Sequence, residues 1–408
     1  MIKRIAAITA IFFCTAFAWA ILGTTIFSRT YSSFAGLKGK VVSTWGAPHE
    51  QKPPSACYQE VIPQTIESLV DGKTVMRTVP QQVAHPLPLE SSRINVTLDL
   101  EHRQKGLLWY STYKVAFAAR YVFRNTSDQE QPVTFTFHFP VARAVYDDLQ
   151  LAVDGVPLPS GNEKAASGVV RVAAGKAAVF DVSYRSQGLD WWRYSFGSDV
   201  TQARDFTLRM TTNFKDIDFP ENTLSPSQKR QTAGGWELTW AYKNLVSGFQ
   251  IGMAMPEKLQ PGPLAGQISY FAPVSLFFFF FLMFIITTLR SIELHPMNYF
   301  FLAAAFFSFH LLLAYLVDHI SIHLAFAICS AVSIFLVVSY LRLAVGIRFA
   351  ALEAGTAQFI YLVLFSYAFF FKGFTGLAIT VGSILTLFVV MQMTGRIRWA
   401  ERFGRRAA

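Results

Sequence analysis

The chain has 408 residues, of which 52% are hydrophobic and 15% are charged, and its formal net charge is +10 at pH 7. That hydrophobic share is too high for an ordinary soluble protein, and the length allows two or three domains. Residues 28–267 contain 25 Lys/Arg and 22 Asp/Glu, so this long stretch supplies only +3 of the net charge. The positive charge therefore concentrates beside the apolar segments, which favours membrane topology over nucleic-acid binding.

Six apolar segments account for the hydrophobicity. Each is close to the roughly 20 residues needed to cross about 30 Å of hydrocarbon. The first is N-terminal and the other five follow residue 267: Ile5–Phe27, Ile268–Leu289, Tyr299–Val317, Ser321–Leu341, Gly355–Phe371 and Gly376–Met393. We predict an α-helical membrane bundle of six spans, one N-terminal and five C-terminal.

Basic residues flank alternate ends of these spans. Ten lie at the N-terminus, after spans two and four, and in the C-terminal tail: Lys3, Arg4, Arg290, Arg342, Arg348, Arg396, Arg398, Arg402, Arg405 and Arg406. The opposite loops have a single Lys372 and the pair Asp318-His319. Since positive residues accumulate on the cytoplasmic side, we expect both termini to be cytoplasmic and residues 28–267 to be periplasmic. The arginine tail is interpreted as an anchor that also contacts anionic lipid.

The first apolar segment has two interpretations. Lys3-Arg4, an apolar stretch and the small-residue patterns Ala16-Phe17-Ala18 or Ala18-Trp19-Ala20 would suit a cleaved secretory signal. The apolar character continues to Phe27, however, which is longer than the 7–15 residues typical of a signal core. We therefore favour an uncleaved membrane anchor.

Residues 28–267 have the pattern of a β-rich domain. Val133–Phe139 alternates apolar and polar residues with period two, as a strand with one buried face does. Asn125–Asp128 is a turn cluster, and Asp154-Gly155 is a hairpin signal because glycine readily takes positive φ. Further strands are expected at Tyr113–Phe123, Leu149–Val153, Val169–Val172, Ala178–Tyr184, Phe206–Thr212 and Trp236–Trp240. Many short strands favour an all-β, sandwich-like domain of one or two antiparallel sheets.

Several features of this domain have a structural and a functional interpretation. Gly46–Pro63, with its prolines, is expected to be an irregular connection from the anchor. Cys57 is the only cysteine outside the spans, which excludes a disulfide within the domain. The patch Trp191-Trp192-Arg193-Tyr194 could bind sugar or lipid headgroups, but we favour two rings in the core and the others at the membrane interface. Asp147-Asp148 is interpreted as a solvated loop, because neighbours on a strand point to opposite faces.

The sequence contains no catalytic constellation. Gly72-Lys73-Thr74 has the end of a phosphate loop, but Glu67 stands where its leading glycine belongs. The motifs HExxH, CxxC, GxSxG and GxGxxG are absent, and the histidines of the β-rich stretch lack the spacing of a zinc site. We predict no catalytic, cofactor-binding or metal-binding residue and no cofactor.

The ionisable groups of the spans are the candidate functional residues, because such groups are costly in a membrane. His310 lies inside span three, and Asp318, His319 and His323 cluster where spans three and four meet. If span four were helical from its start, His319 and His323 would share a face as an i,i+4 pair. A metal or proton site is one interpretation; the favoured one is a hydrated loop in which Asp318 caps span four. His295-Pro296 is interpreted as the start of span three.

The stretch from Leu294 to His319 resembles the bacterial inner-membrane CreD family. It contains Leu294-His295-Pro296-Met297-Asn298-Tyr299, then Phe309, the run Leu311-Leu312-Leu313 and the acid-histidine pair. Trp45-Gly46, Asn213-Phe214, Asp218-Phe219-Pro220, Ser225-Pro226, Gly235-Trp236 and Trp240 are similar to the family's periplasmic part. Asp318 replaces the more usual Glu, and His310 stands where Tyr is common.

The resemblance implies an inner-membrane protein of Gram-negative type linked to cell-envelope integrity, colicin tolerance and responses to cell-wall-active antibiotics. We expect a non-enzymatic protein with a membrane anchor at 1–27, a periplasmic β-rich domain at 28–267 that binds a protein or cell-wall ligand, a five-span domain at 268–395 and a basic tail at 396–408. Membrane lipids are the other expected partners, and nucleic acid is not. The alternative is a small transporter or flippase-like channel using His310. An enzyme acting on peptidoglycan or lipid ranks third.

Overall fold

The structure is a computed structural model that describes residues 2–70, 73–105, 108–159, 161–197, 201–371 and 373–395. The predicted basic tail and Lys372 lie outside these residues. The chain forms two compact units. A helical unit comprises Met1–Leu37, Gly106–Leu108 and Leu259–Ala408, and a β unit comprises Lys38–Lys105 and Trp109–Lys258.

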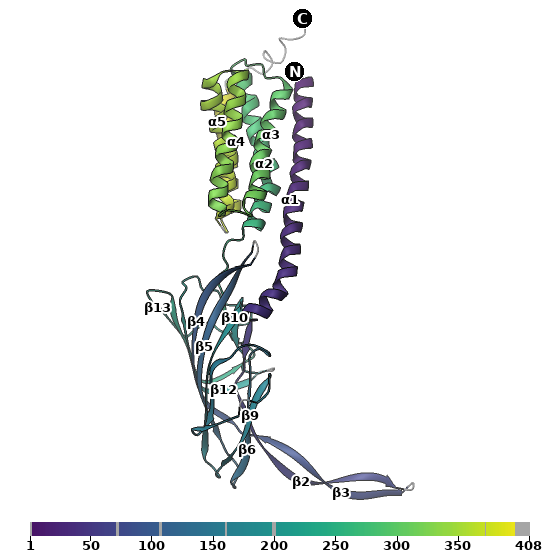
Figure 1. Ribbon diagram of the computed structural model, residues 1–408, viewed down its shortest axis with the longest axis vertical. Coiled ribbons are helices and arrows are strands. Elements are labelled where there is room, and N and C mark those ends of the chain that lie inside the picture. Colours follow the sequence, from purple (N-terminus) through teal and green to yellow (C-terminus); the bar gives the residue numbers. More distant parts are fainter. Residues whose placement is uncertain are drawn as a thin grey trace. The chain divides into compact units, whose positions relative to one another are not determined.

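The helices of the chain confirm the predicted membrane architecture. The long helices are α1 (Ile2–Trp45), α2 (Pro261–Leu289), α3 (Pro296–Leu316), α4 (Ile322–Ala344) and α7 (Thr375–Thr394). A further helical stretch, Phe349–Phe370, makes six candidate spans among the described residues, one N-terminal and five C-terminal (Figure 1). α1 continues well beyond Phe27, where the predicted span ends, because residues 28–45 contain no proline to stop it.

The fifth span differs from a regular α-helix. It alternates π-helical, α-helical and 3-10 turns, which are η1 (Phe349–Ala354), α5 (Gly355–Gln358), η2 (Phe359–Leu364), α6 (Phe365–Tyr367) and η3 (Ala368–Phe370). The prediction that this span begins at Gly355 is wrong, since η1 adds a turn that contains Glu353. An ion pair between Glu353 and Arg290, the residue that follows α2, neutralises this carboxylate, which allows the helix to include it.

Helix α1 packs closely against α2 and α3 within the helical unit. A Cβ atom on Gly266 would lie 3.3 Å from Cγ2 of Ile26, and one on Gly262 would lie 2.6 Å from Oγ1 of Thr30. Small residues let membrane helices approach in this way. Trp19 of α1 is fully buried, and its ring packs edge-on against Phe306 of α3. Trp19 therefore joins α1 to the buried apolar cluster of the helical unit.

The β unit contains three sheets. Its strands are β1 (His49–Gln51), β2 (Ser55–Val70), β3 (Lys73–Pro86), β4 (Leu89–Lys105), β5 (Leu108–Arg124), β6 (Gln131–His138), β7 (Asp147–Val153), β8 (Val156–Pro157), β9 (Ala165–Val172), β10 (Ala177–Leu189), β11 (Trp191–Tyr194), β12 (Thr201–Thr212), β13 (Gln228–Gln231), β14 (Trp236–Ser247) and β15 (Ile251–Ala254). Eight strands form a sheet in the order β13-β14-β12-β4-β5-β10-β7-β8, four in the order β3-β2-β6-β9, and three in the order β1-β11-β15.

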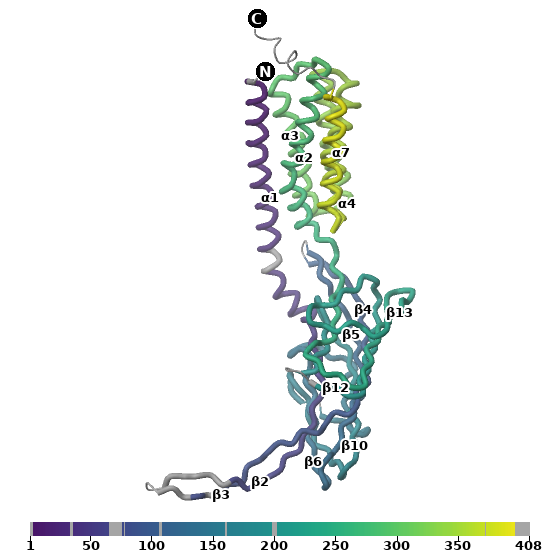
Figure 2. The backbone as a smooth tube through the Cα atoms, turned by 180° about the vertical axis from the view of Figure 1, so that it is seen from behind, coloured from purple at the N-terminus to yellow at the C-terminus, as the bar shows by residue number. Residues whose placement is uncertain are grey.

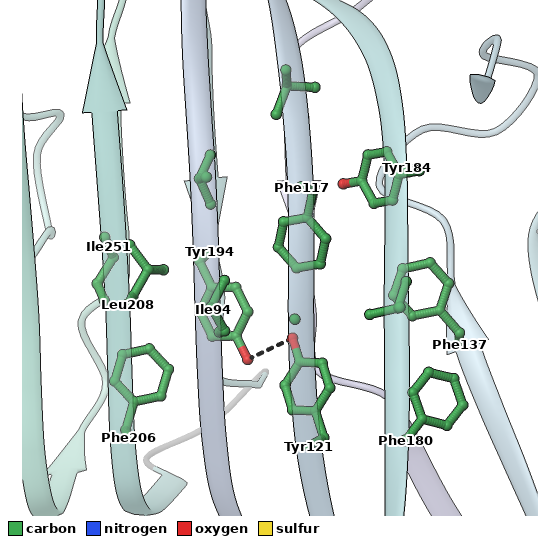
Figure 3. Packing of buried hydrophobic residues seen from close by; sticks show 14 of the residues in the cluster. Ile94, Phe117, Tyr121, Phe137, Phe180, Tyr184, Tyr194, Phe206, Leu208 and Ile251 are labelled. Carbon is green, nitrogen blue, oxygen red and sulfur yellow. Dashed lines mark hydrogen bonds between the residues drawn. The ribbon is translucent and has the colours of Figure 1, made fainter. Parts of the chain in front are cut away.

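The core of the β unit lies between the eight-stranded and four-stranded sheets. Strand β5 alternates buried and exposed residues along most of its length, as a strand with one buried face does. Its Phe123 meets Phe135 of β6 edge-on, and Phe137 of β6 stacks near Phe180 of β10. Figure 3 shows the rings of Phe137 and Phe180 beside those of Tyr184, Phe117 and Tyr121, all of which belong to this buried cluster. This arrangement confirms a sandwich-like β-rich domain.

Three details of the predicted β unit need correction. The sheets are not wholly antiparallel, because β12 pairs with β4, and β1 with β11, in parallel. Strands distant in sequence are brought together there, and local alternation does not encode that pairing. The expected irregular connection at Gly46–Pro63 is wrong, since β1 and most of β2 occupy it. Asp147-Asp148 begins β7 rather than lying in a loop, although both side chains are exposed as expected.

Other local predictions are confirmed. Asp154 and Gly155 have φ of 48° and 80° and connect β7 to β8 as a hairpin turn. Asn125 accepts from the backbone N–H of Ser127 at 3.0 Å, which fixes the predicted turn. Cys57 is a free, partly buried thiol on β2. In β11, Trp192 and Tyr194 are buried. The Arg193 guanidinium lies 4.7 Å from the ring centroid of Trp191.

Strands β2 and β3 form a long hairpin that the sequence did not predict. Their register runs from Cys57 opposite Pro86 to Val70 opposite Lys73. Only Ser55–Cys57 of β2 also pairs with β6. Beyond this base the hairpin projects from the rest of the β unit as a two-stranded ribbon, which is plain in both backbone views (Figures 1 and 2).

Candidate functional site along helix α3

The N-terminal end of α3 is built by the motif His295-Pro296. His295 has an extended backbone, and its Nδ1 accepts from the backbone N–H of Met297 at 3.2 Å, so it caps the helix. Pro296 occupies the first helical position, where its fixed φ is favourable. The interpretation of this motif as a helix start is confirmed.

The next two motif residues join α3 to its neighbours. Tyr340 of α4 donates from its hydroxyl to Oδ1 of Asn298 at 2.8 Å. Tyr299 is fully buried, and its ring meets Phe280 of α2 edge-on at 5.3 Å. The family motif therefore fixes both the start of α3 and its packing against α2 and α4.

His310 lies in the C-terminal half of α3 within an aromatic enclosure. Its side chain is fully buried, and the rings of Trp19, Phe306 and Phe309 lie 5.5, 6.1 and 4.9 Å from its ring centroid. Within the described part of the chain, neither ring nitrogen has a hydrogen-bond partner, and the indole nitrogen of Trp19 has none either. A buried imidazole without a partner is costly when charged, so this enclosure favours the neutral form.

Asp318 lies just beyond the C-terminal end of α3 and forms an ion pair with Arg29 of α1. The Arg29 guanidinium reaches Oδ2 of Asp318 at 3.0 Å and Oδ1 at 3.3 Å, and it also donates to the carbonyl of Ala314 at 2.7 Å. The last carbonyls of a helix lack partners within the helix and carry partial negative charge. Arg29 thus satisfies the end of α3 and the Asp318 carboxylate together, with the ring of Tyr315 5.6 Å from the guanidinium carbon.

The capping role predicted for Asp318 is therefore wrong. Ser321 is the N-cap of α4 and makes no side-chain cap hydrogen bond, whereas Asp318 engages α1. Arg29 lies only two residues past the predicted first span, so a signal was present in the sequence. Its partner could not be deduced, because the two residues are 289 positions apart.

The predicted His319 and His323 pair does not form one helical face. His319 lies in the turn before α4, which begins at Ile322, so the assumed helix does not include it. Both side chains are exposed, and His323 packs 5.2 Å from the ring of Phe370. No cluster of three or more His, Cys, Asp or Glu side chains suited to a metal occurs in the described part of the chain.

Sequence reasoning missed a buried polar chain between α4 and the fifth span. Gln358 donates from Nε2 to Oγ of Ser333 at 2.9 Å, and Ser333 donates to the carbonyl of Ala305 at 2.6 Å. Gln358 and Ser333 are both fully buried, and Gln358 lies at the α-turn between the two π-helical segments. Such π-bulges occur often at functional sites. Gln358 is a single polar residue in an apolar segment, and this was the feature of the sequence that could have indicated the buried chain.

The residues that the sequence singled out therefore lie along one helix without meeting at one point. His295, Pro296 and Tyr299 build its start, His310 lies in its C-terminal half, and Asp318 and His319 follow its end. A second ion pair, from Arg290 Nη1 to Glu353 Oε1 at 2.6 Å, joins α2 to η1. The arrangement is a set of interhelical connections centred on α3.

The β unit presents a shallow polar groove on its eight-stranded sheet. It has a volume of about 490 Å³ and includes Arg93, Arg120, Gln150 and Asp181. Arg93 pairs with Asp205 and Arg120 pairs with Asp181, so both guanidinium groups have partners. The Arg93 pairing lowers the pKa of the Asp205 carboxyl. This surface offers no activated nucleophile among its lining residues.

The comparisons with known proteins match the helical part of the chain to one family. The family model described as Inner membrane protein CreD matches residues 265–400. The predicted resemblance is thereby confirmed over the five C-terminal spans, which include the whole of α3. The β unit lies outside the matched residues.

The other comparisons identify no protein from which a function of this chain can be inferred. No curated protein matches the chain. Among solved structures, the chain is similar to a Legionella pneumophila protein titled "putative nutrient binding protein", with 11% sequence identity, a TM-score of 0.33, and coverage of 57% of this chain and 76% of that one.

Proposed function

We propose, with residues 265–400 as a CreD-family membrane region, that this chain is a non-enzymatic inner-membrane protein that supports envelope integrity and the response to envelope or antibiotic stress. In this proposal its β unit faces the periplasm and binds a partner protein or a cell-wall ligand, and both chain termini are cytoplasmic. The distribution of basic residues between the short loops supports this orientation.

The observation that carries the proposal is the projecting β2–β3 hairpin. A two-stranded hairpin alone is at best marginally stable in water, and beyond Cys57 this one has no third strand in the described residues. It also exposes apolar side chains, since Val61 is 60% and Met76 67% exposed. A long ribbon that costs ordering entropy and exposes apolar surface is best explained as an arm that binds a partner.

The hairpin's own residues indicate how a partner would bind. Pro63 lies opposite Pro80, and neither proline has a backbone N–H to offer to an added strand. Prolines on a free edge oppose strand addition. We therefore expect the partner to contact side chains, above all Val61 and Ile62, rather than to extend the sheet.

A shortened hairpin tests the proposal. Tyr58 pairs with His85, so replacing residues 59–84 by Asn-Gly should close the ribbon with a favourable two-residue turn. We expect normal abundance in the membrane and loss of complementation under cell-wall-active antibiotics in a strain that lacks the protein. Full complementation by this variant would refute the binding-arm proposal.

Photocrosslinking gives the matched positive test. A photoreactive side chain at Val61 or Ile62 should give a discrete crosslinked product in whole cells. The same group at Val169 of β9, which is 64% exposed, is the control and should give none. Equal products at both sites would indicate nonspecific surface contact.

The alternative function, a small transporter or flippase-like channel, is favoured by one observation. His310 is fully buried in a span with two unpartnered ring nitrogens, and buried titratable groups mark proton and substrate pathways in membrane proteins. His310→Tyr tests it, because Tyr is the residue common in the family and cannot relay protons near neutral pH. Normal abundance and near-normal complementation support the non-transport proposal; normal abundance with complete loss of complementation supports the transporter.

A further inference from the structure

Arg4 is a partly buried cation near the start of α1, and no ion pair of its guanidinium occurs in the described residues. Its Nε and Nη2 atoms are shielded from solvent and have no hydrogen-bond partner. The guanidinium carbon lies 6.0 Å from the ring centroid of Phe284 on α2. Lys3, the preceding residue, is exposed. Two consecutive basic residues are therefore held in different surroundings.

Burial of an unpaired guanidinium is unfavourable. A charged group removed from water requires a pair or a set of hydrogen bonds, and the weak attraction to a ring face leaves the donors on Nε and Nη2 of Arg4 without a partner. The two unpartnered atoms belong to the planar fork that matches carboxylate or phosphate oxygens in a bidentate manner. Arg4 can thus donate hydrogen bonds to an anionic oxygen group.

An apolar groove begins beside Arg4 and runs between α1 and α2. Its volume is about 380 Å³. Nine residues line it, and only one of them is polar: Ile5, Ile8, Thr9, Phe12, Phe13, Phe277, Phe280, Phe281 and Phe284. Phe284 belongs both to the groove and to the contact with Arg4, so the cation marks one end of the groove. Phe13 and Phe277 are 65% and 51% exposed, which leaves the groove open to the surrounding lipid.

We propose that this groove is a binding site for an anionic phospholipid. One acyl chain lies along the aromatic residues, and the phosphate accepts hydrogen bonds from Nε and Nη2 of Arg4. The apolar lining suits hydrocarbon, and the buried fork supplies the partner that the phosphate requires. Basic pockets between membrane helices bind anionic lipid headgroups by the same chemistry. The site joins α1 to α2 and is independent of the proposed role of the hairpin.

Native mass spectrometry of the full-length protein in detergent tests the headgroup contact. The protein is titrated with phosphatidylglycerol and, separately, with phosphatidylcholine of the same chains. We expect phosphatidylglycerol to bind at least ~10-fold more weakly to Arg4→Gln than to the wild type, in line with the loss of a charge-assisted bidentate pair. Lys3→Gln removes the same charge one residue earlier and should change binding less than about twofold.

Arg4→Lys keeps the charge and removes the fork, so it should lie between the wild type and Arg4→Gln. It also serves as the test if Arg4→Gln does not yield folded protein, because full affinity in Arg4→Lys would overturn the bidentate contact. Equal losses in Lys3→Gln and Arg4→Gln would show diffuse surface attraction and would overturn the proposal. Inorganic phosphate should not displace the lipid; displacement would show that the site takes free phosphate instead.

Filling the groove tests the acyl-chain contact separately. Thr9→Phe places a ring within the lining, and we expect it to weaken binding of both lipids by a similar factor. Ala327→Phe adds the same ring at an exposed position of α4 and should leave binding unchanged. Unchanged binding in Thr9→Phe, or an equal loss in Ala327→Phe, would overturn the assignment of the chain to this groove.

Discussion

The two units of this chain use charge in different ways. In the β unit the ion pairs lie on the surface, as in Arg120–Asp181, whose side chains are 65% and 42% exposed. In the helical unit the acids of the Arg29–Asp318 and Arg290–Glu353 pairs are shielded: Asp318 is 19% and Glu353 18% exposed. Surface pairs contribute little to stability, whereas a shielded pair in a membrane unit determines which helices are neighbours. Both units have a buried apolar cluster, and in the helical unit the shielded ion pairs add specific links between helices.

Both units contain buried polar groups with partners and buried polar groups without them. Asn125 of the β unit donates to the carbonyls of Gln129 and Val172, both at 2.9 Å, and Tyr184 donates to Gln51 at 2.8 Å. In the helical unit His310 and the indole of Trp19 remain without partners. His49 is the counterpart of His310 in the β unit, because it is fully buried and both its ring nitrogens lack partners.

The largest expected effect follows from His49. Desolvation by burial lowers its pKa from 6.5 to about 4. The unfolded chain therefore binds more protons than the folded one between about pH 6.5 and pH 4, so stability is complete above this window and falls as the pH falls through it. A shift of this size corresponds to a loss of about 3 kcal/mol by pH 4.

Urea unfolding of the β unit, expressed without the spans, measures this effect. The unit should first give a β-rich far-UV circular dichroism spectrum. Burial raises the pKa of Asp190, an effect of opposite sign, so the test is the difference between the wild type and His49→Phe. That difference should grow as the pH falls from 6.5 to 4. A constant difference would show that His49 does not titrate with a lowered pKa in the folded state.

An intermediate effect is expected at the Arg29–Asp318 pair. Asp318→Ala leaves the Arg29 guanidinium partly shielded and without its acid; removal of one partner of a fully buried pair costs 3–5 kcal/mol. Because Arg29 is 35% exposed, we expect about 1–2 kcal/mol. Thermal unfolding in detergent of Asp318→Ala, Arg29→Gln and the double variant measures the coupling. Additive losses would show that the pair does not hold α1 to the end of α3.

Much of the fold could be predicted from local patterns, and the interhelical contacts could not. Span length and hydropathy identify the six helices, period-two alternation identifies β6 and β10, and Pro296 marks the start of α3. The Arg29–Asp318 contact joins residues far apart in sequence. A single sequence does not indicate which distant residues form such a pair. The β2–β3 hairpin was missed because residues 59–64 of β2 are all exposed, so they lack the alternation that strand recognition requires.

The smallest effect is expected at Arg120–Asp181, which serves as the contrast to Arg29–Asp318. Its atoms lie 2.8 Å apart, closer than those of the Arg29 pair, so distance alone would predict a stronger interaction. Solvent screens exposed charges and their side chains lose entropy on pairing, so we expect a coupling smaller than that of Arg29–Asp318. A double-mutant cycle of Arg120→Ala and Asp181→Ala, followed by urea unfolding of the β unit, measures it.

Raising the salt concentration to about 1 M should remove most of this coupling, because the screening length then falls to about 3 Å. The shielded Arg29–Asp318 coupling should retain most of its value under the same salt. Equal coupling energies and salt responses at the two pairs would contradict the distinction drawn between the units, since shielding would then have no influence on what an ion pair contributes.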